Sequence, residues 1–445
     1  MARVHPPLPS PKGQFLIGHT LQYMRDPLGF LTRVAREYGD MVRLRLGDTT
    51  TIQLSNPDDI SEVLRNHPED FIKDRLTRIL DPVIGQGLLT SEGTFWRRQR
   101  KLIQPAFTHQ AIQRYGQVMV DFAEQRGGAW KLGQTIDVHA EMMSLTLEIV
   151  AKTLFDANIT DEAAEVGGLI EIMMDYYLDP TKWLRIREWI PTPSTLRFKK
   201  AIKRLDEIMY GIIRERRASP RDPGDLLSFL LKALDDEGSG MTDKQLRDEA
   251  VTLFLAGHET TALTLSYTFF LLAEHPEVDA KLAAEIKQVL GDRPPTPADV
   301  PQLKYADWII KESMRLYPPA WGIGRELTRD AEVGGKVFPK GTQFVMSQWV
   351  THRDPRWFED ADAFKPERWD HDLIKKLPKG AYFPFGDGPR VCIGNHFATM
   401  EAILLLASIA RRYRLERGSE GTLHLSPSIT LRPKYGVPMW VRERD

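Results

Sequence analysis

The chain has 445 residues, of which 42% are hydrophobic and 27% are charged, a balance typical of a water-soluble globular protein. Its 60 basic and 61 acidic residues give a formal net charge of -1, which argues against a nucleic-acid partner. The single cysteine, Cys392, excludes an intramolecular disulfide and fits a reducing compartment.

The N-terminal residues 1–20 form a proline-rich arm without an apolar run long enough for a signal peptide or a transmembrane anchor. We therefore expect a soluble, cytoplasmic protein. No linker-like stretch or internal repeat follows, so residues 1–445 are expected to form a single domain despite their length.

Apolar spacing predicts a small mixed region at the start of the chain. The predicted elements are a helix over 28–38, strands over 42–46 and 51–54, and a helix over 57–66. Asn56 is a suitable N-cap for the second helix. A loop containing Leu88 and Leu89 comes next.

Trp96 and Arg100 are four residues apart, so they share one face of a predicted helix. An indole N–H and a guanidinium on one face can both donate to a single carboxylate. Taken alone, the pair is equally typical of a solvated basic helix. Arg97, Arg98 and Lys101 form either a docking face for an acidic protein or a solvated surface.

A mostly helical pattern extends over 111–213, interrupted at 179–193 by an apolar, proline-bounded segment. That segment is either an ordinary packed loop or a surface that touches a membrane. A longer helix is predicted over 242–274, where Thr242 and Gln245 have capping-box spacing. Apolar residues surround this helix on all sides, which predicts that it is buried through the centre of the protein.

The middle of that helix, residues 256–261, is unusual for a buried position. Gly257 costs about 1 kcal/mol relative to alanine, Glu259 must be paired or protonated, and Thr260 can bend the helix by bonding back to a carbonyl. Such local inconsistencies concentrate at functional sites. His258 is expected to be a packed or solvent-facing side chain rather than a metal ligand.

A further helix is predicted over 304–317, with Glu312 and Arg315 on one face. An exposed pair of this kind contributes almost nothing to stability, so the pair alone is a weak signal. Strand-like residues lie within 335–346, around a turn at 339–341, and short strands are expected after Tyr413, around Leu415, Leu423, Leu425 and Leu431.

Cys392 lies in a glycine-rich loop over 385–394, just before a predicted helix. Pro389 stiffens the loop, and Arg390 places a fixed positive charge near the sulfur. A helix N-terminus favours a thiolate, so we expect the loop to lower the thiol pKa and to present a ligand for one soft metal ion. A lone cysteine is otherwise usually a small buried hydrophobic residue.

The pattern Phe-x-x-Gly-x-Arg-x-Cys-x-Gly over 385–394 resembles the haem-binding loop of the cytochrome P450 family. Three further motifs agree with that family in order: Trp96-x-x-x-Arg100, the segment 256–261, and Glu312-x-x-Arg315 followed by Arg368. The resemblance covers essentially the whole chain from Pro7 onward. It implies a mainly α fold with a minor antiparallel β part, in which haem b lies between the long central helix and the cysteine-bearing helix.

The resemblance also implies a role for each matching residue. Cys392 would be the iron ligand; Trp96, Arg100, Arg325, Phe385, Arg390, Gly394 and Ala256 would contact the haem; Thr260 and Glu259 would deliver protons. Glu312, Arg315 and Arg368 would hold the cysteine loop in place. Leu88, Leu89, Ala320 and Gly322 would line the substrate pocket, and segment 179–193 would cover its entrance.

The implied activity is that of a monooxygenase, which inserts one oxygen atom of O2 into a C–H bond of a hydrophobic substrate. Fatty acids, terpenoids, carotenoids and steroids are candidate substrates. Electrons from NAD(P)H would arrive through a separate ferredoxin, flavodoxin or reductase, and the protein is expected to be a monomer.

Two other functions are compatible with the same motifs. One is a peroxygenase driven by hydrogen peroxide, against which the acid–alcohol pair Glu259–Thr260 argues. The other is a non-enzymatic haem carrier or gas sensor, which would usually need an attached output domain; the sequence contains no recognisable one.

Overall fold

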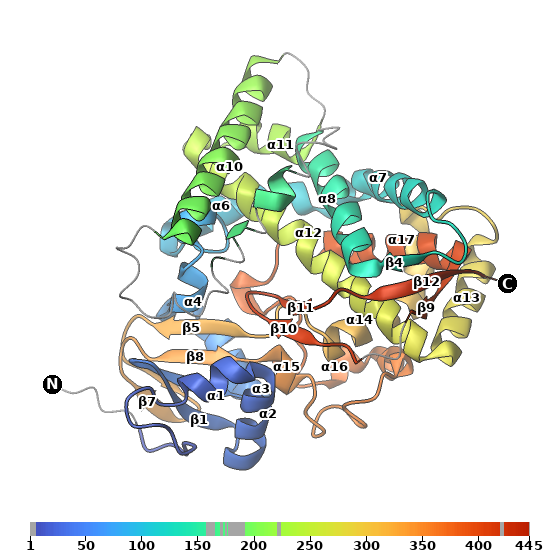
Figure 1. The fold of residues 1–445 in the computed structure, drawn as a ribbon. Helices are drawn as coiled ribbons and strands as arrows, with labels where there is room; N and C mark the ends of the chain where they lie inside the picture. The colour runs from blue at the N-terminus through green and yellow to red at the C-terminus, as the bar shows by residue number, and fades with distance from the viewer. Residues whose placement is uncertain are drawn as a thin grey trace.

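The computed structural model describes residues 6–156, 165–169, 172–173, 176, 192–219, 224–418 and 422–444. Helices dominate one side of the molecule and the largest sheet lies on the other (Figure 1). The predicted break at 179–193 lies outside the described residues except for its last two. No helix in the described ranges combines the length and the apolar character needed to cross a bilayer.

The longest helix, α12 (Asp243–Glu274), runs through the middle of the protein, as predicted (Figure 1). Thr242 and Gln245 form the expected capping box. Three helices of the core pack against it: α8 (Val138–Phe155), α14 (Lys304–Leu316) and α17 (Asn395–Arg412). The predicted helix over 304–317 is therefore confirmed as α14.

The remaining α-helices with described bounds surround this centre. They are α1 (Thr20–Arg25), α2 (Pro27–Tyr38), α3 (Pro57–Ser61), α4 (Arg75–Arg78), α5 (Asp81–Ile84), α6 (Gly93–Ile103), α7 (His109–Gly128), α10 (Pro193–Ala218), α11 (Leu226–Lys232), α13 (Pro276–Leu290), α15 (Gln348–Thr351) and α16 (Leu373–Lys376). Asn56 caps α3 as predicted, because its side chain accepts from the Asp58 N–H over 2.8 Å.

The largest sheet has five strands in the order β1-β2-β8-β5-β3. Its members are β1 (Met41–Leu46), β2 (Thr49–Leu54), β8 (Gln343–Met346), β5 (Ile323–Leu327) and β3 (Phe71–Lys73). Neighbouring strands are antiparallel, except that β2 and β8 are parallel. This sheet positions β3 and β5 side by side, which matters for the site described below.

Three small antiparallel sheets complete the fold. They consist of β4 (Thr135–Asp137) with β12 (Pro438–Glu443) and β9 (Tyr413–Arg417), of β10 (Leu425–Pro427) with β11 (Leu431–Pro433), and of β6 (Ala331–Val333) with β7 (Lys336–Phe338). The strands predicted within 335–346 are present, but β7 and β8 belong to different sheets. Leu423 precedes β10 and is not in a strand.

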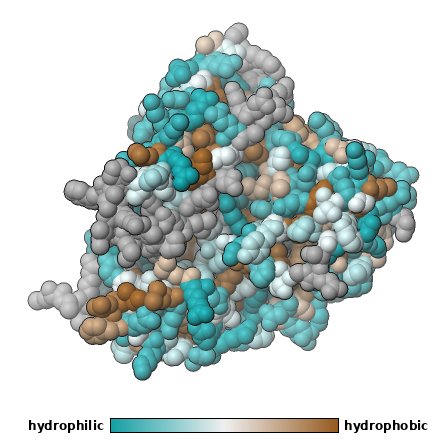
Figure 2. Space-filling model, in the orientation of Figure 1, coloured by the Kyte–Doolittle hydropathy of each residue, from teal (hydrophilic) through white to brown (hydrophobic). Residues whose placement is uncertain are grey.

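Most of the face shown in Figure 2 is hydrophilic, with apolar side chains gathered in small areas. Two of the most exposed large apolar side chains, Phe15 and Leu16, lie in the N-terminal arm and are 93% and 80% exposed. A loop of this arm is held closed by paired backbone hydrogen bonds between Gln14 and Gly18. The arm is therefore ordered over its described residues.

Candidate active site

The single cysteine lies in a tight loop directly before α17. The Cys392 N–H donates to the Phe385 carbonyl oxygen over 2.9 Å and closes the loop. Gly388 has a φ of +67°, and a Cβ there would overlap the Leu64 carbonyl oxygen, so the loop requires glycine. The helix begins immediately after its cap residue, Gly394, which confirms the predicted position of the cysteine.

The Cys392 side chain is accessible in the folded chain, yet burial raises the pKa of its thiol. The Gly394 N–H and the Arg100 charge oppose this shift but do not reverse it. The thiol is thus accessible to a small group although protein atoms surround much of it. The expectation that the loop alone lowers the thiol pKa is wrong, because desolvation dominates; a coordinated metal ion would deprotonate the thiol.

Cations from α6 and from the cysteine loop lie beside the sulfur. Arg100 Nη1 donates to the Val391 carbonyl oxygen over 2.9 Å. The Arg390 guanidinium lies 4.0 Å from the centre of the Trp96 ring and pairs with Glu92. Both α6 residues predicted to act together, Trp96 and Arg100, therefore contact the cysteine loop.

Two further cations lie opposite each other on neighbouring strands of the large sheet. Lys73 on β3 and Arg325 on β5 are cross-strand partners. Burial and the nearby Arg390 lower the pKa of Arg325 to about 10, and burial and both arginines lower the pKa of Lys73 well below its usual value. Like charges held together away from water favour a bound anion. Lys73 has no motif of its own, so only this strand pairing identifies it.

Residues 256–261 of α12 differ in how far they are exposed. Ala256 is exposed although most of its neighbours on the helix are buried. Thr260 Oγ1 donates to the Ala256 carbonyl oxygen over 2.9 Å, the back-bond expected of a helical threonine. A Cβ on Gly257 would lie 3.1 Å from Val150 on α8, so this glycine permits helix packing, and Ala256 supplies the accessible surface.

The acid of this segment is held by the C-terminal hairpin. Glu259 is 3% exposed, and it accepts hydrogen bonds from Arg432 Nε over 2.5 Å and from Thr430 Oγ1 over 2.6 Å. Burial opposes ionisation of Glu259, but the hydrogen bond and charge of Arg432 outweigh it and lower the carboxyl pKa. His258 is packed as expected, with Nδ1 3.0 Å from the Phe254 carbonyl oxygen.

Glu312, Arg315 and Arg368 meet in one cluster, in which Glu312 and Arg315 are fully buried and Arg368 is partly buried. Arg315 donates to both Glu312 carboxylate oxygens over 2.8 and 2.9 Å, and Arg368 Nε donates over 2.8 Å. Trp369 Nε1 adds a fourth hydrogen bond over 2.9 Å. The two α14 residues have no solvent exposure, so the weak sequence signal corresponds to a buried ion pair rather than an exposed one.

This buried cluster connects to the cysteine loop through His352. Arg315 Nη1 donates to the His352 carbonyl oxygen over 2.9 Å. His352 Nε2 then accepts from the Phe383 N–H over 3.0 Å. Phe383 lies two residues before Phe385, whose carbonyl oxygen receives the Cys392 N–H. Two hydrogen bonds thus link the ion pair to the start of the loop.

The residues expected to line a substrate pocket are partly accessible. Leu88 and Leu89 are half-buried and pack against the apolar cluster that includes side chains of α8, α10 and α12. Ala320 is half-buried, and Gly322 is exposed between α14 and β5. The structure therefore leaves all four able to contact a small molecule.

Comparison with protein families then decides the classification. The model of the family described as Cytochrome P450 matches residues 6–437 of the chain. The protein belongs to the cytochrome P450 family. As a cytochrome P450 it is a haem b monooxygenase that hydroxylates hydrophobic substrates with O2 and with electrons from NAD(P)H, which reach it through a partner protein.

Similar cytochromes P450 occur in Streptomyces. The cyclooctat-9-en-7-ol 5-monooxygenase of Streptomyces melanosporofaciens is 40% identical, over 90% of this chain and 87% of its own length. The pentalenene oxygenase of Streptomyces avermitilis is 34% identical, over 90% and 89%. Among solved structures, the haem domain of cytochrome P450DA superposes with a TM-score of 0.90 at 29% identity and covers 100% of this chain and 99% of its own.

The residues around Cys392 fit haem b. The haem iron requires one accessible sulfur, which Cys392 offers. Its two propionates require cations, and Lys73, Arg325 and Arg390 form a desolvated positive cluster beside the cysteine loop. The opposite face requires a small side chain, and Ala256 of α12 is a small and accessible one.

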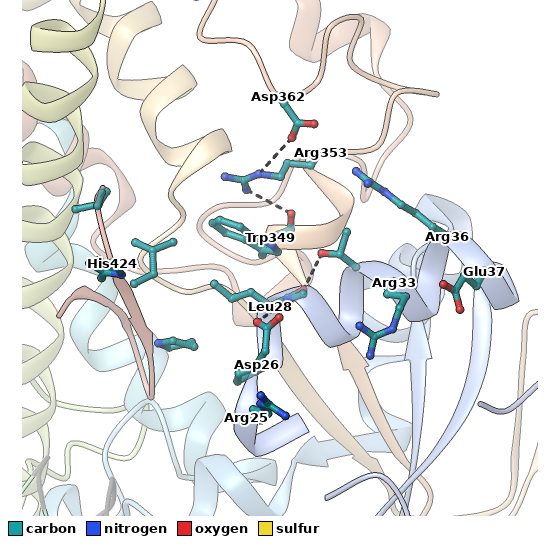
Figure 3. A pocket seen from close by; sticks show the side chains of 16 residues that line it. Arg25, Asp26, Leu28, Arg33, Arg36, Glu37, Trp349, Arg353, Asp362 and His424 are labelled. Carbon is teal, nitrogen blue, oxygen red and sulfur yellow. Dashed lines mark hydrogen bonds and ion pairs between the residues drawn. The ribbon is translucent and has the colours of Figure 1, made fainter. Parts of the chain in front are cut away.

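A surface groove of about 800 Å³ lies elsewhere, between α2, α15 and β10 (Figure 3). Its floor contains Trp349, over which the Arg353 guanidinium stacks 3.4 Å from the ring centre. Arg353 also lies 3.8 Å from Asp362. None of the predicted site residues appears among the described residues that line this groove, so we do not assign the activity to it.

A buried acid on the cysteine-bearing helix has no assigned role. Glu401 is 0% exposed, and neither carboxyl oxygen has a hydrogen-bond partner in the described chain. Burial raises the pKa of Glu401 to about 8, while the nearby Thr261 hydroxyl opposes the shift. The side chain is thus a neutral carboxylic acid at pH 7.

The Glu401→Gln variant is expected to flatten the pH dependence of stability. Because the folded state holds a proton that the unfolded chain releases near pH 4.5, wild-type stability falls as pH rises from about 4.5 to about 8. The loss from this group is at most about 5 kcal/mol. Urea unfolding of both haem-loaded proteins at pH 6 and pH 9 measures the difference, and equal pH dependence would contradict a neutral Glu401.

Proposed function

We propose that the chain, acting as a single-domain monomer, hydroxylates a cyclic terpenoid, with Cys392 as the axial ligand of haem iron. The observation that carries the assignment is the Cys392 thiol, accessible inside the protein and bordered by Arg100. The names of the Streptomyces relatives support the substrate class, since they specify cyclooctat-9-en-7-ol and pentalenene. Leu88 and Leu89 offer the apolar surface that such a substrate requires.

In this proposal the chain holds the cofactor by complementary charge and shape. Trp96, Arg100 and Arg390 would hold one haem propionate, and Arg325 and Lys73 would hold the other. Phe385 and Gly394 flank the thiolate, and the Gly394 N–H lowers its basicity by hydrogen bonding. Bound haem b would supply an iron centre at which O2 is activated, one oxygen atom being inserted into a C–H bond and the other leaving as water.

The proton groups of α12 act on the face opposite the thiolate. Thr260 Oγ1 is bonded to the Ala256 carbonyl oxygen and stands one turn from the accessible Ala256 surface. By rotating about χ1, its hydroxyl can present a proton to that surface. Glu259 is ionised and held by Arg432, so it can relay a proton only after this ion pair opens. Thr260 is therefore the immediate proton-holding group.

We further assign electron delivery to a separate ferredoxin, flavodoxin or reductase. The α6 cations offer only part of a docking face for such a partner. Arg98 pairs with Asp235 over 2.6 Å and Lys101 with Asp236 over 2.6 Å. Arg97 is exposed, and the described residues show no ion pair for it. Docking must therefore recruit cations beyond α6.

The function is tested by reconstituting the haem-loaded protein with a ferredoxin, its reductase, NADPH and pentalenene. The expected result is a hydroxylated product that carries 18O from 18O2. Product formed only with hydrogen peroxide would identify a peroxygenase instead. Absence of product across fatty acids, terpenoids, carotenoids and steroids, together with no spectral response to any of them, would favour a haem carrier or sensor.

The Thr260→Ala variant is expected to bind haem normally but to waste electrons. Without the hydroxyl, proton delivery is disordered, so the product formed per NADPH falls several-fold and hydrogen peroxide rises. Thr260→Ser keeps a hydroxyl at the same place and should restore most of the yield. An unchanged ratio of product to NADPH in the alanine variant would remove Thr260 from the mechanism.

A further inference from the structure

The loop containing Leu88 is fastened to the first half of α12 by two adjacent carboxylates. The Gln86 N–H donates to Asp248 Oδ2 over 3.0 Å, and the Leu88 N–H donates to Glu249 Oε2 over 3.0 Å. Both acids are buried, at 3% and 0% exposure. Buried hydrogen bonds to a carboxylate are among the stronger ones in a protein. The two bonds therefore fix which residue of the loop lies beside which residue of α12.

Glycines allow the loop to lie directly on the helix. A Cβ on Gly85 would overlap the Asp248 carboxylate, and a Cβ on Gly87 would overlap Thr252 Oγ1. Gly85 also has a φ of +57°, which favours glycine by itself. The backbone of the loop therefore lies too close to α12 for a side chain at position 85 or 87.

Glu249 also holds a third element. Its Oε1 accepts from Gln99 Nε2 over 3.1 Å, and Gln99 belongs to α6, the helix that carries Trp96 and Arg100. Arg98 Nη1 donates to Gln99 Oε1 over 3.1 Å and fixes the orientation of the amide. One carboxylate thus joins the loop, α6 and α12.

The position of Glu249 along α12 shows how far the loop lies from the accessible part of that helix. Glu249 and Ala256 are seven residues apart, which is two helical turns along one face and about 10.5 Å. Leu88 is bonded to the first of these turns, and Thr260 is one turn beyond Ala256. A molecule lying on Ala256 would therefore meet Leu88 and Leu89 at its far end.

We propose that Glu249 is a positioning residue that fixes Leu88 and Leu89 over the substrate site and thereby sets which ligands fit and which of their carbons lies near the iron. This inference rests on the proposed haem site. The carboxylate acts through the Leu88 N–H, and it does not itself touch the substrate. Selectivity should follow the presence of an acceptor at position 249 rather than the presence of charge.

Azole binding tests this without requiring turnover. Imidazole reports access to the haem iron, whereas 4-phenylimidazole also reports the apolar surface beyond it. In Glu249→Leu the Leu88 N–H loses its acceptor, so the loop is held at Gln86 but no longer at Leu88. The affinity for 4-phenylimidazole relative to imidazole should fall about fivefold, as it should in Leu88→Ala.

Three further variants complete the experiment. Gly87→Ala pushes the loop off Thr252 through different atoms and should give the same shift, which preserves the test if Glu249→Leu does not fold. Glu249→Gln retains one acceptor for the Leu88 N–H and gives up only the hydrogen bond from Gln99, so it should keep the wild-type azole ratio. Asp243→Asn, which removes an exposed acid of α12 paired with Arg217, should also change nothing.

An unchanged azole ratio in both Glu249→Leu and Gly87→Ala, alongside a shift in Leu88→Ala, would overturn the proposal. A shift in Glu249→Gln as large as in Glu249→Leu would also overturn it, because charge rather than the tether would then be responsible. Failure of the monooxygenase assay would leave these azole titrations unaffected, so the two conclusions are tested separately.

Discussion

Haem-loaded Cys392→Ser is expected to lose monooxygenase activity completely. Serine oxygen is a poor substitute for a thiolate, which pushes electron density onto iron and favours O–O cleavage. The reduced carbon-monoxide complex should therefore lack the absorption band characteristic of thiolate ligation. Visible spectroscopy of the purified variant measures this directly.

Because Cys392 is the only cysteine, thiol alkylation provides an independent control. The apoprotein should accept one label per chain, since the side chain is accessible. Bound haem should protect the thiol, and the serine variant should accept none. Labelling that is indifferent to haem, or a thiolate-type band in the serine variant, would show that another group holds the iron.

Arg315→Ala is expected to have the second largest effect. It leaves the Glu312 carboxylate buried with one guanidinium fewer and deprives the His352, Ala361 and Ala363 carbonyl oxygens of their donors. Breaking a fully buried pair costs about 3–5 kcal/mol. Haem affinity should fall as well, because the same arginine reaches the cysteine loop through His352.

A matched control lies on the same helix. Lys311 pairs with Asp307 over 2.5 Å, but both side chains are partly exposed, so Lys311→Ala should cost no more than about 1 kcal/mol. Urea unfolding midpoints and haem content of the two variants give the comparison. Similar losses in both would mean that burial adds nothing to the Glu312–Arg315 pair.

Local sequence signals predict much of this fold and the chemical centre of the site. The capping box at Thr242 and the Asn56 cap are encoded within a few residues, and both are present. The cysteine loop is equally local, since Gly388 and the Cys392–Phe385 hydrogen bond lie within ten residues. Such features depend on backbone conformation, which short motifs specify well.

The partners that complete the site come from distant parts of the chain and leave no such signal. Lys73 meets Arg325 only through strand pairing, and Glu259 meets Arg432 only through the C-terminal hairpin. Glu249 binds a loop that lies about 160 residues earlier. Lys73, Arg432 and Glu249 each look like an ordinary charged residue in sequence, because the role of each depends on tertiary neighbours.

The contribution of the C-terminal hairpin has a consequence for biosynthesis. Glu259 acquires Arg432 only after a further 173 residues have been translated. A nascent chain still on the ribosome would carry an unneutralised acid in the middle of α12. We therefore expect haem capture to wait for this hairpin, and messages truncated before codon 432 to yield pigment-free, protease-sensitive product.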